Sequence, residues 1–131
     1  MRYLASDETW YWIGCVDFNH TWVYTASDPK GEWSLAREID TCFYDCGLLF
    51  DDKDDIYVAY GDTNISVAQL NNDLSVRQIQ NVYNGSFYIE GSRAYQINGT
   101  YYILVSTASL LLLQFITDSL TSGTEHSTGE R

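Results

Sequence analysis

Basic residues are scarce in this sequence of 131 residues, which contains seven Lys and Arg against eighteen Asp and Glu and has a formal net charge of -11. Nucleic acids and anionic lipid surfaces are bound chiefly through Lys and Arg side chains. A chain with this charge would be repelled by both of them. The composition therefore excludes nucleic acids and membrane surfaces as partners.

Proline and methionine are also rare, with one residue of each, whereas aromatic residues make up 15% of the chain. Aromatic side chains favour strands because they suit a pleated and half-buried surface. A hydrophobic content of 45% argues against disorder, and the length is sufficient for one domain with its own core. We therefore expect a globular all-β protein.

Long apolar runs are absent from the sequence. The longest nearly uncharged stretch, residues 101–117, is interrupted by polar residues and is shorter than the roughly 20 apolar residues of a spanning helix. The N-terminus has no charged start followed by an apolar run, so the chain shows no signal peptide. Four Asn-X-Ser/Thr sequons nevertheless favour an extracellular full-length parent, and they begin at Asn19, Asn64, Asn84 and Asn98.

Cysteine occurs three times, an odd number that leaves no complete set of pairs. Cys15, Cys42 and Cys46 also lack the paired spacing of a zinc site, so we expect no metal and no cofactor. Cys42 and Cys46 could form a disulfide bond or could be small buried side chains, and the second interpretation is favoured.

The chain repeats with a period of about 45 residues, which lies in the range of β-propeller blades. The repeat aligns three aromatic strand centres at Tyr11, Tyr57 and Tyr102. Each complete unit shows four short antiparallel strands separated by turn residues, as a propeller blade does. The pattern predicts a partial β-propeller. Its blades are placed at about 1–40, 41–85 and 86–117, and residues 118–131 are expected to form a polar, disordered tail.

The third unit is incomplete. Residues 110–116 can be aligned with its third strand, although the four leucines at 110–113 could instead form a short helix. No outer strand is visible after them. An incomplete ring of blades leaves sheet edges unpaired, so we expect the chain to self-associate through its open blade edges.

Two acidic residues occupy equivalent positions at the start of the inner strands of neighbouring units. Asp45 lies twelve residues before Tyr57, and Glu90 lies twelve residues before Tyr102. Inner strands converge on the propeller axis, so both carboxylates are expected there. Paired carboxylates near aromatic side chains suit glycoside hydrolysis, in which one acid protonates the leaving oxygen. Alternatively, both side chains bond only the turn backbone at the strand starts.

Several aromatic residues could line a sugar subsite, because the C–H faces of sugars stack on aromatic rings. Packing between blades uses the same residue types at the same period, and for each residue taken singly packing is favoured. Phe18 and Tyr44 lie next to the inferred axis and are the better candidates for substrate binding. The wider set also contains Trp12, Trp22, Phe43 and Phe87.

Three segments, Tyr44 to Asp52, Ile56 to Gly61 and Glu90 to Tyr102, resemble the inner-strand motifs of glycoside hydrolase family 43. Residues 4–25 are similar to the second blade of fungal members that act on arabinoxylan. The resemblance covers roughly residues 1–107, and the order and spacing of its motifs make it fairly specific. It implies a partial five-bladed β-propeller.

The resemblance also implies roles for the two carboxylates. Glu90 matches the general acid of the family, and Asp45 matches the aspartate that orients this acid and raises its pKa. Members are inverting and require a further aspartate as the general base, and this chain begins after the position of that base. The role is assigned neither to Asp17 nor to the acidic cluster at residues 51–55, which is interpreted as a solvated turn.

The resemblance implies a fragment of a hydrolase that cleaves arabinofuranosyl or xylosyl residues from arabinoxylan, as an α-L-arabinofuranosidase or a β-xylosidase. The fragment is expected to be inactive alone because the base is not in it. The alternative is a non-catalytic carbohydrate-binding or interaction β-domain, in which the aromatic residues bind sugar and the carboxylates only shape the pocket.

Overall fold

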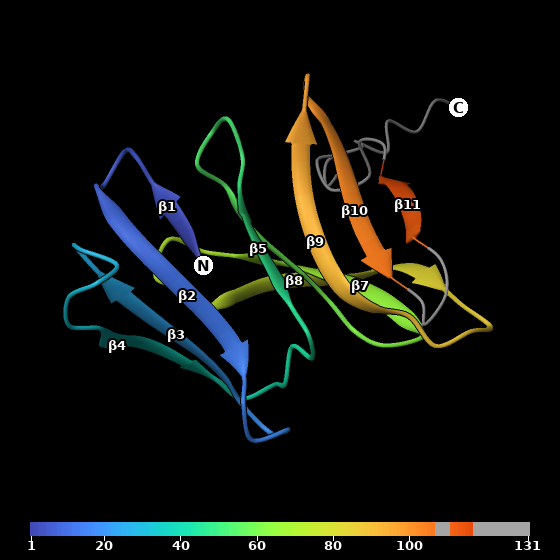
Figure 1. The fold of residues 1–131 in the computed structure, drawn as a ribbon, viewed down its shortest axis with the longest axis horizontal. Helices are drawn as coiled ribbons and strands as arrows, with labels where there is room; N and C mark the ends of the chain where they lie inside the picture. The colour runs from blue at the N-terminus through green and yellow to red at the C-terminus, as the bar shows by residue number, and fades with distance from the viewer. Residues whose placement is uncertain (107–110, 117–131) are drawn as a thin grey trace, which may run out of the picture.

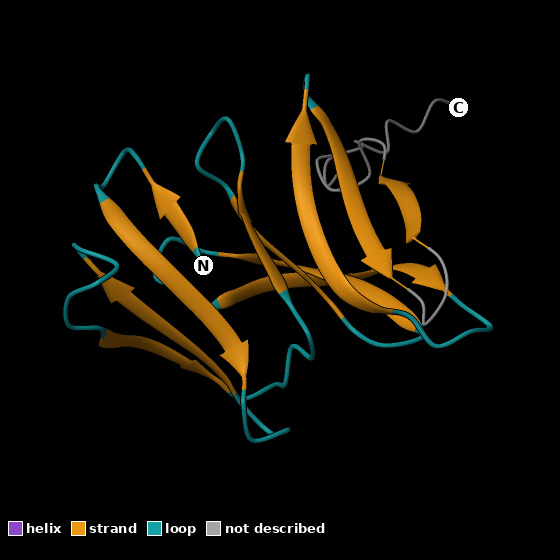
Figure 2. Ribbon diagram, in the orientation of Figure 1, coloured by secondary structure: helices purple, strands orange, loops and turns teal. Residues whose placement is uncertain are grey.

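The fold consists of three antiparallel β-sheets that follow one another along the chain (Figures 1 and 2). The structure is a computed structural model, and it describes residues 1–106 and 111–116. Within these residues every regular element is a strand, which confirms the prediction of an all-β chain. No helix in this described part is long and apolar enough to cross a membrane.

The first sheet has the strand order β1-β2-β3-β4 and is built from neighbouring segments of the chain. Its turns are stabilised by Asp side chains that accept hydrogen bonds from backbone amides a few residues further along the chain, as Asp commonly does in turns. Asp7 Oδ1 accepts a hydrogen bond from the Thr9 amide at 3.0 Å, and Asp28 Oδ1 accepts one from the Lys30 amide at 2.9 Å. The strands are β1 (Arg2–Leu4), β2 (Thr9–Cys15), β3 (Thr21–Ala26) and β4 (Ser34–Ile39).

The second sheet repeats this order with β5-β6-β7-β8. The acidic turn between its first two strands is organised by Asp51, whose Oδ1 accepts bonds from the Lys53 and Asp55 amides at 2.8 and 2.9 Å. Asp51 is only 7% exposed, so the interpretation of the whole cluster as a solvated turn is wrong for this residue. The strands are β5 (Gly47–Phe50), β6 (Ile56–Tyr60), β7 (Asn64–Leu70) and β8 (Val76–Asn84).

The third sheet contains β9 (Glu90–Ile97), β10 (Thr100–Ser106) and β11 (Leu111–Ile116), with β10 in the middle. Asn98 and Gly99 form the turn between β9 and β10 with φ values of 51° and 77°, the left-handed conformation that Asn-Gly hairpins adopt. The helix considered for the leucine run is wrong for residues 111–113, which belong to β11. The tail at 118–131 lies outside the described residues.

The core lies in two layers, one on each side of the second sheet. One layer contains Ile13, Val23 and Phe43 and packs against Val58, whereas the other contains Ile89 and Ile103 with residues of β6 and β7. Alternate residues of a strand point to opposite faces, so the second sheet can be covered on both. Two four-stranded sheets and one three-stranded sheet that share core layers with their neighbours are the arrangement of consecutive propeller blades.

The inner strands of the three sheets lie side by side, with β5 between β1 and β9 (Figure 1). Arg2 of β1 connects them, because its guanidinium donates to the Leu48 carbonyl at 2.9 Å and to the Ala94 carbonyl at 3.4 Å. Gly47 lets β5 and β9 approach closely, since a Cβ there would lie 2.3 Å from the Ser92 carbonyl oxygen. This contact brings the starts of β5 and β9 together.

A disulfide bond joins Cys15 at the end of β2 to Cys42 in the segment before β5. The expectation of Cys42 as a small, unpaired buried side chain is therefore wrong. The partner is 27 residues away in sequence, and the two Cα atoms are 5.2 Å apart. Cys46 is free, and burial raises the pKa of its thiol to about 11, so this thiol is neutral at physiological pH. Sequence spacing alone could not identify the pair because strand folding creates the proximity.

Removal of this disulfide bond is expected to destabilise the chain by roughly 3 to 4 kcal/mol, because the bond closes a long loop in the unfolded state. The measurement is urea unfolding of a Cys15→Ser/Cys42→Ser double variant beside the oxidised wild type. Cys46→Ser is the matched control, since it removes a cysteine without opening a loop. Equal unfolding midpoints for the double variant and the control would contradict the prediction.

Candidate active site

Asp45 and Glu90 come together at the starts of β5 and β9, although 45 positions of sequence separate them. Asp45 precedes β5 with φ 45°, and Glu90 is the first residue of β9. Asp45 Oδ2 accepts a hydrogen bond from the amide of Gly91, the residue after Glu90, at 2.5 Å. The carboxylate of one blade therefore fixes the backbone that carries the carboxylate of the next.

The backbone around Glu90 is further restrained by Gly91 and Ser106. Gly91 has φ +73°, a left-handed conformation that favours glycine, and a Cβ there would lie 3.2 Å from Ser106 Oγ. The same Oγ donates a hydrogen bond to the Glu90 carbonyl at 3.3 Å. A β-bulge in the pairing of β9 with β10 lies at this point. Bulges often redirect a side chain next to a functional site, which fits the position of Glu90.

Two tyrosines bind the same oxygen of the Glu90 carboxylate. Tyr44 and Tyr88 each donate a hydroxyl hydrogen bond to Glu90 Oε1 at 2.9 Å. The neighbouring Tyr44 hydroxyl, and then Glu90, raise the pKa of Tyr88 well above its usual range. Sequence analysis missed Tyr88. Its spacing of two residues from Glu90 could have indicated that the two side chains lie together, because residues i and i+2 of an extended chain share one face.

Phe18 provides an exposed aromatic face beside this group. Its side chain is 75% exposed, its φ is 61°, and its ring stacks on Tyr44 with centroids 6.1 Å apart and an interplanar angle of 24°. Since Tyr44 also binds Glu90, the three residues form a continuous surface. The structure thus places Tyr44 against the candidate acid and Phe18 against Tyr44.

The other aromatic candidates divide between core and surface. Phe43 is fully buried and stacks on Tyr60, whereas Phe87 is among the most exposed residues. Trp12 is half-buried and packs edge-on against Tyr24, so it belongs to the packing of the first sheet. Packing between blades is therefore the correct interpretation for Phe43.

A cavity of about 420 Å³ lies along the inner strands β1, β5 and β9. Arg2, Trp12, Leu48 and Arg93 contribute to its wall. Arg93 donates hydrogen bonds to the Ser92 carbonyl at 2.8 Å and to the Cys46 carbonyl at 3.5 Å. Its guanidinium therefore links the backbone that follows Glu90 to the backbone that follows Asp45. The Cys46 thiol beside this cavity is held neutral by burial and is a poor nucleophile.

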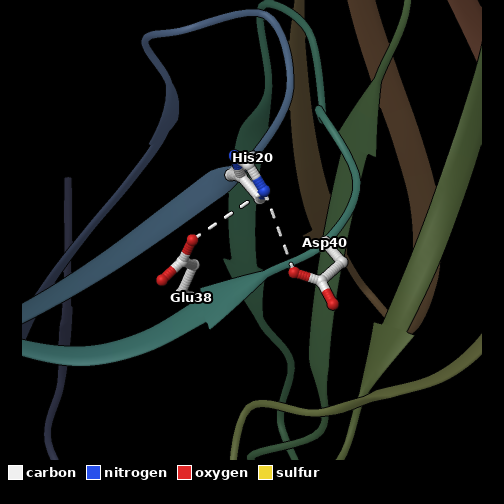
Figure 3. Close-up of side chains that lie close together, drawn as sticks. All are labelled: His20, Glu38 and Asp40. Atoms are coloured by element: carbon white, nitrogen blue, oxygen red, sulfur yellow. Dashed lines mark ion pairs between the residues drawn. The ribbon is translucent and has the colours of Figure 1, made fainter.

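His20, Glu38 and Asp40 form a group on the outer part of the first sheet that could hold a metal ion (Figure 3). His20 Nε2 lies 3.9 Å from Glu38 Oε1 and from Asp40 Oδ1, and its Nδ1 lies 3.1 Å from Asp17 Oδ2. The hydrogen bond with Asp17 raises the pKa of His20, while backbone hydrogen bonds from His20 and Asn19 lower the pKa of Asp17. Asp17 therefore serves to order this loop.

The arrangement at Glu90 combines a carboxyl group, two phenol hydroxyls and an exposed aromatic ring. A carboxylic acid can deliver a proton to a leaving oxygen, phenol hydroxyls can position that acid, and a ring face can stack on a sugar. The surface therefore combines a group that can donate a proton with a ring that can stack on a sugar.

Comparison with known proteins identifies one family. The model of glycosyl hydrolases family 43 matches residues 4–118. A solved GH43 glycoside hydrolase, engineered to display both endo-xylanase and exo-arabinofuranosidase activity, is 36% identical with a TM-score of 0.81 over 88% of this chain and 25% of its own. No curated protein sequence matches the chain.

Two further solved structures share the fold. A bifunctional GH43-CE protein of Bacteroides eggerthii is 25% identical with a TM-score of 0.66, over 79% of this chain and 15% of its own. The Bacteroides ovatus protein described as Xyloglucan PUL GH43B is 21% identical with a TM-score of 0.71, over 88% of this chain and 25% of its own. The chain thus spans a quarter or less of the length of these three proteins.

Proposed function

The chain belongs to glycosyl hydrolases family 43, and on this premise we propose that Glu90 and Asp45 form part of a carbohydrate-cleaving active site. The observation that carries the proposal is the continuous surface of Phe18, Tyr44 and Glu90. It sets an aromatic face for a sugar ring beside a carboxyl group that can protonate a glycosidic oxygen. The hydrogen bond from the Gly91 amide to Asp45 Oδ2 holds the backbone next to Glu90, and so keeps the Glu90 carboxyl at the start of β9.

In the proposed reaction Glu90 is the general acid, and Asp45 orients it through the backbone. Inverting hydrolysis is a single displacement: water attacks the anomeric carbon while the bond to the leaving oxygen breaks. Glu90 gives its proton to that oxygen, and a general base on the opposite face takes a proton from the water. We assign no residue of this chain as the base, so the site requires a carboxylate from another part of the propeller.

We propose arabinofuranosyl or xylosyl residues of plant cell-wall polysaccharide as the substrate. The support is the resemblance of residues 4–25 to fungal members that act on arabinoxylan, together with the 36% identity to an enzyme described as an endo-xylanase and exo-arabinofuranosidase. Because the chain spans only part of such a protein, we also propose that it is inactive alone. The four Asn-X-Ser/Thr sequons support the proposal that a full-length parent acts outside the cell.

The test compares the chain alone with the same chain joined to the remaining blades of a family member. Release of arabinose and xylose from arabinoxylan is measured for both proteins, and sugar binding is measured by calorimetry. We expect hydrolysis only from the completed propeller. Arabinose release by the chain alone at a comparable rate would refute the need for an external base, and a completed propeller without hydrolysis would refute the proposed activity.

A sugar-binding module without catalysis remains the second candidate, and the exposure of Phe18 favours it. An aromatic ring on a protein surface is the usual platform for a sugar, and it needs no general base. In the same experiment, oligosaccharide binding by the completed propeller without release of any sugar would support this alternative.

A further inference from the structure

Glu90 Oε1 receives hydrogen bonds from two blades at once. The Tyr44 hydroxyl comes from the segment before β5, and the Tyr88 hydroxyl comes from the segment before β9, each at 2.9 Å. Within the described part of the chain no hydrogen bond joins the Asp45 side chain to the Glu90 carboxyl; Asp45 Oδ2 instead accepts one from the Gly91 amide. The carboxyl orientation therefore depends on the two phenols.

Two bonds to one oxygen make the two carboxyl oxygens unequal. Each carboxylate oxygen offers about two lone-pair sites, so the two hydroxyls occupy both sites of Oε1. A proton on Glu90 then belongs on Oε2, which receives no hydrogen bond from any residue of the described chain. The geometry thus separates an anchored oxygen from a proton-carrying oxygen.

We propose that Tyr88 is a positioning residue that, with Tyr44, anchors Glu90 Oε1 and leaves Oε2 as the atom that exchanges the proton. The inference rests on the proposed function, because it assigns an orientation to the proposed general acid. Tyr88 suits this role since its side chain is 56% exposed and makes its hydroxyl bond at the surface of the site, outside the core. Tyr88 belongs to neither core layer, so removing its hydroxyl removes no core contact.

The ionisation behaviour of Tyr88 agrees with this geometry. The hydrogen-bonding neighbours Tyr44 and Glu90 raise the pKa of Tyr88, as expected for a phenol that donates toward a carboxylate. A tyrosine that merely projected into solvent would titrate in its usual range.

The test uses NMR on the chain itself, without substrate. We expect one side-chain rotamer for Glu90 in the wild type, averaged three-bond couplings in a Tyr44→Phe/Tyr88→Phe variant, and intermediate averaging in Tyr88→Phe. The ring-carbon titration of Tyr88 is expected to move down in pH in Tyr44→Phe and in Glu90→Gln. Tyr3→Phe is the matched control, since Tyr3 packs on Trp10 and makes no bond to Glu90; neither signal should change in it.

An averaged Glu90 rotamer in the wild type, or a Tyr88 titration that is the same in Glu90→Gln as in the wild type, would overturn the inference. Amide spectra of all variants separate loss of positioning from loss of folding. Because these measurements need no turnover, absence of hydrolysis would refute the proposed function without affecting them. Conversely, an unanchored Glu90 in a completed propeller that hydrolyses arabinoxylan would refute only the role of Tyr88.

Discussion

Replacing Glu90 with Gln in the completed propeller is expected to slow arabinoxylan hydrolysis by about 10²- to 10⁴-fold, the usual contribution of a general acid. Gln keeps the shape and the oxygen that accepts bonds from Tyr44 and Tyr88 but has no proton to give. The bound geometry should therefore survive while protonation of the leaving oxygen is lost. Turnover and oligosaccharide affinity are measured together, and affinity should change little.

The leaving group provides a sharper test of this role. An aryl glycoside with p-nitrophenol as leaving group needs little protonation, so the Glu90→Gln variant should be much less impaired on it than on arabinoxylan. Glu38→Gln is the control, because Glu38 lies on β4 beside His20 and away from the proposed acid. Equal losses on both substrates would contradict proton donation by Glu90, as would unchanged turnover.

Replacing Phe43 with Ala is expected to cost about 3–5 kcal/mol of folding free energy, the usual range for truncating a buried Phe. Phe43 is 0% exposed, and its ring stacks on Tyr60 with centroids 4.4 Å apart. It lies in the core layer between the first and second sheets, so a cavity there would loosen both. This loss is a large share of a typical domain stability of about 5–15 kcal/mol, so the unfolding midpoint should fall sharply.

Urea unfolding of Phe43→Ala measures this effect, with Phe18→Ala as the matched control. Both variants lose a phenyl ring, but Phe18 is exposed, so its variant should keep nearly all of its stability and lose sugar binding instead. The Phe43 amide donates a hydrogen bond to Thr21 Oγ1 at 2.7 Å, and this bond does not involve the phenyl ring. Similar unfolding midpoints for the two variants would contradict the assignment of Phe43 to the core.

The hairpins of the fold could be predicted because their causes are local. Asn98 and Gly99 adopt the left-handed turn that their residue types favour, and the alternating apolar residues around them form β9 and β10. The positions of Asp45 and Glu90 at the starts of the inner strands could also be predicted, because the repeat aligns the two residues in the sequence. The leucine run was ambiguous because a short apolar segment suits a strand or a helix equally.

The cysteine pairing and the burial of Asp51 could not be predicted from local patterns. Cys15 meets Cys42 only after β3 and β4 have folded back between them, so their spacing carries no signal. Asp51 looked like one of several surface acids, yet the Tyr101 hydroxyl of the next blade bonds its Oδ2 at 2.7 Å. Folding of the first sheet determined the cysteine pair, and a contact between blades determined the environment of Asp51.

The sequence alone determined the all-β class, the repeated unit and the family, because strand propensity, turn residues and motif spacing are properties of the chain itself. The tertiary structure decided which aromatic rings are core and which are surface, and that two phenols share one oxygen of Glu90. These features depend on how neighbouring sheets stack. Tyr44 lies 46 residues from Glu90 in sequence, and only the close approach of β5 and β9 at Gly47 brings them together.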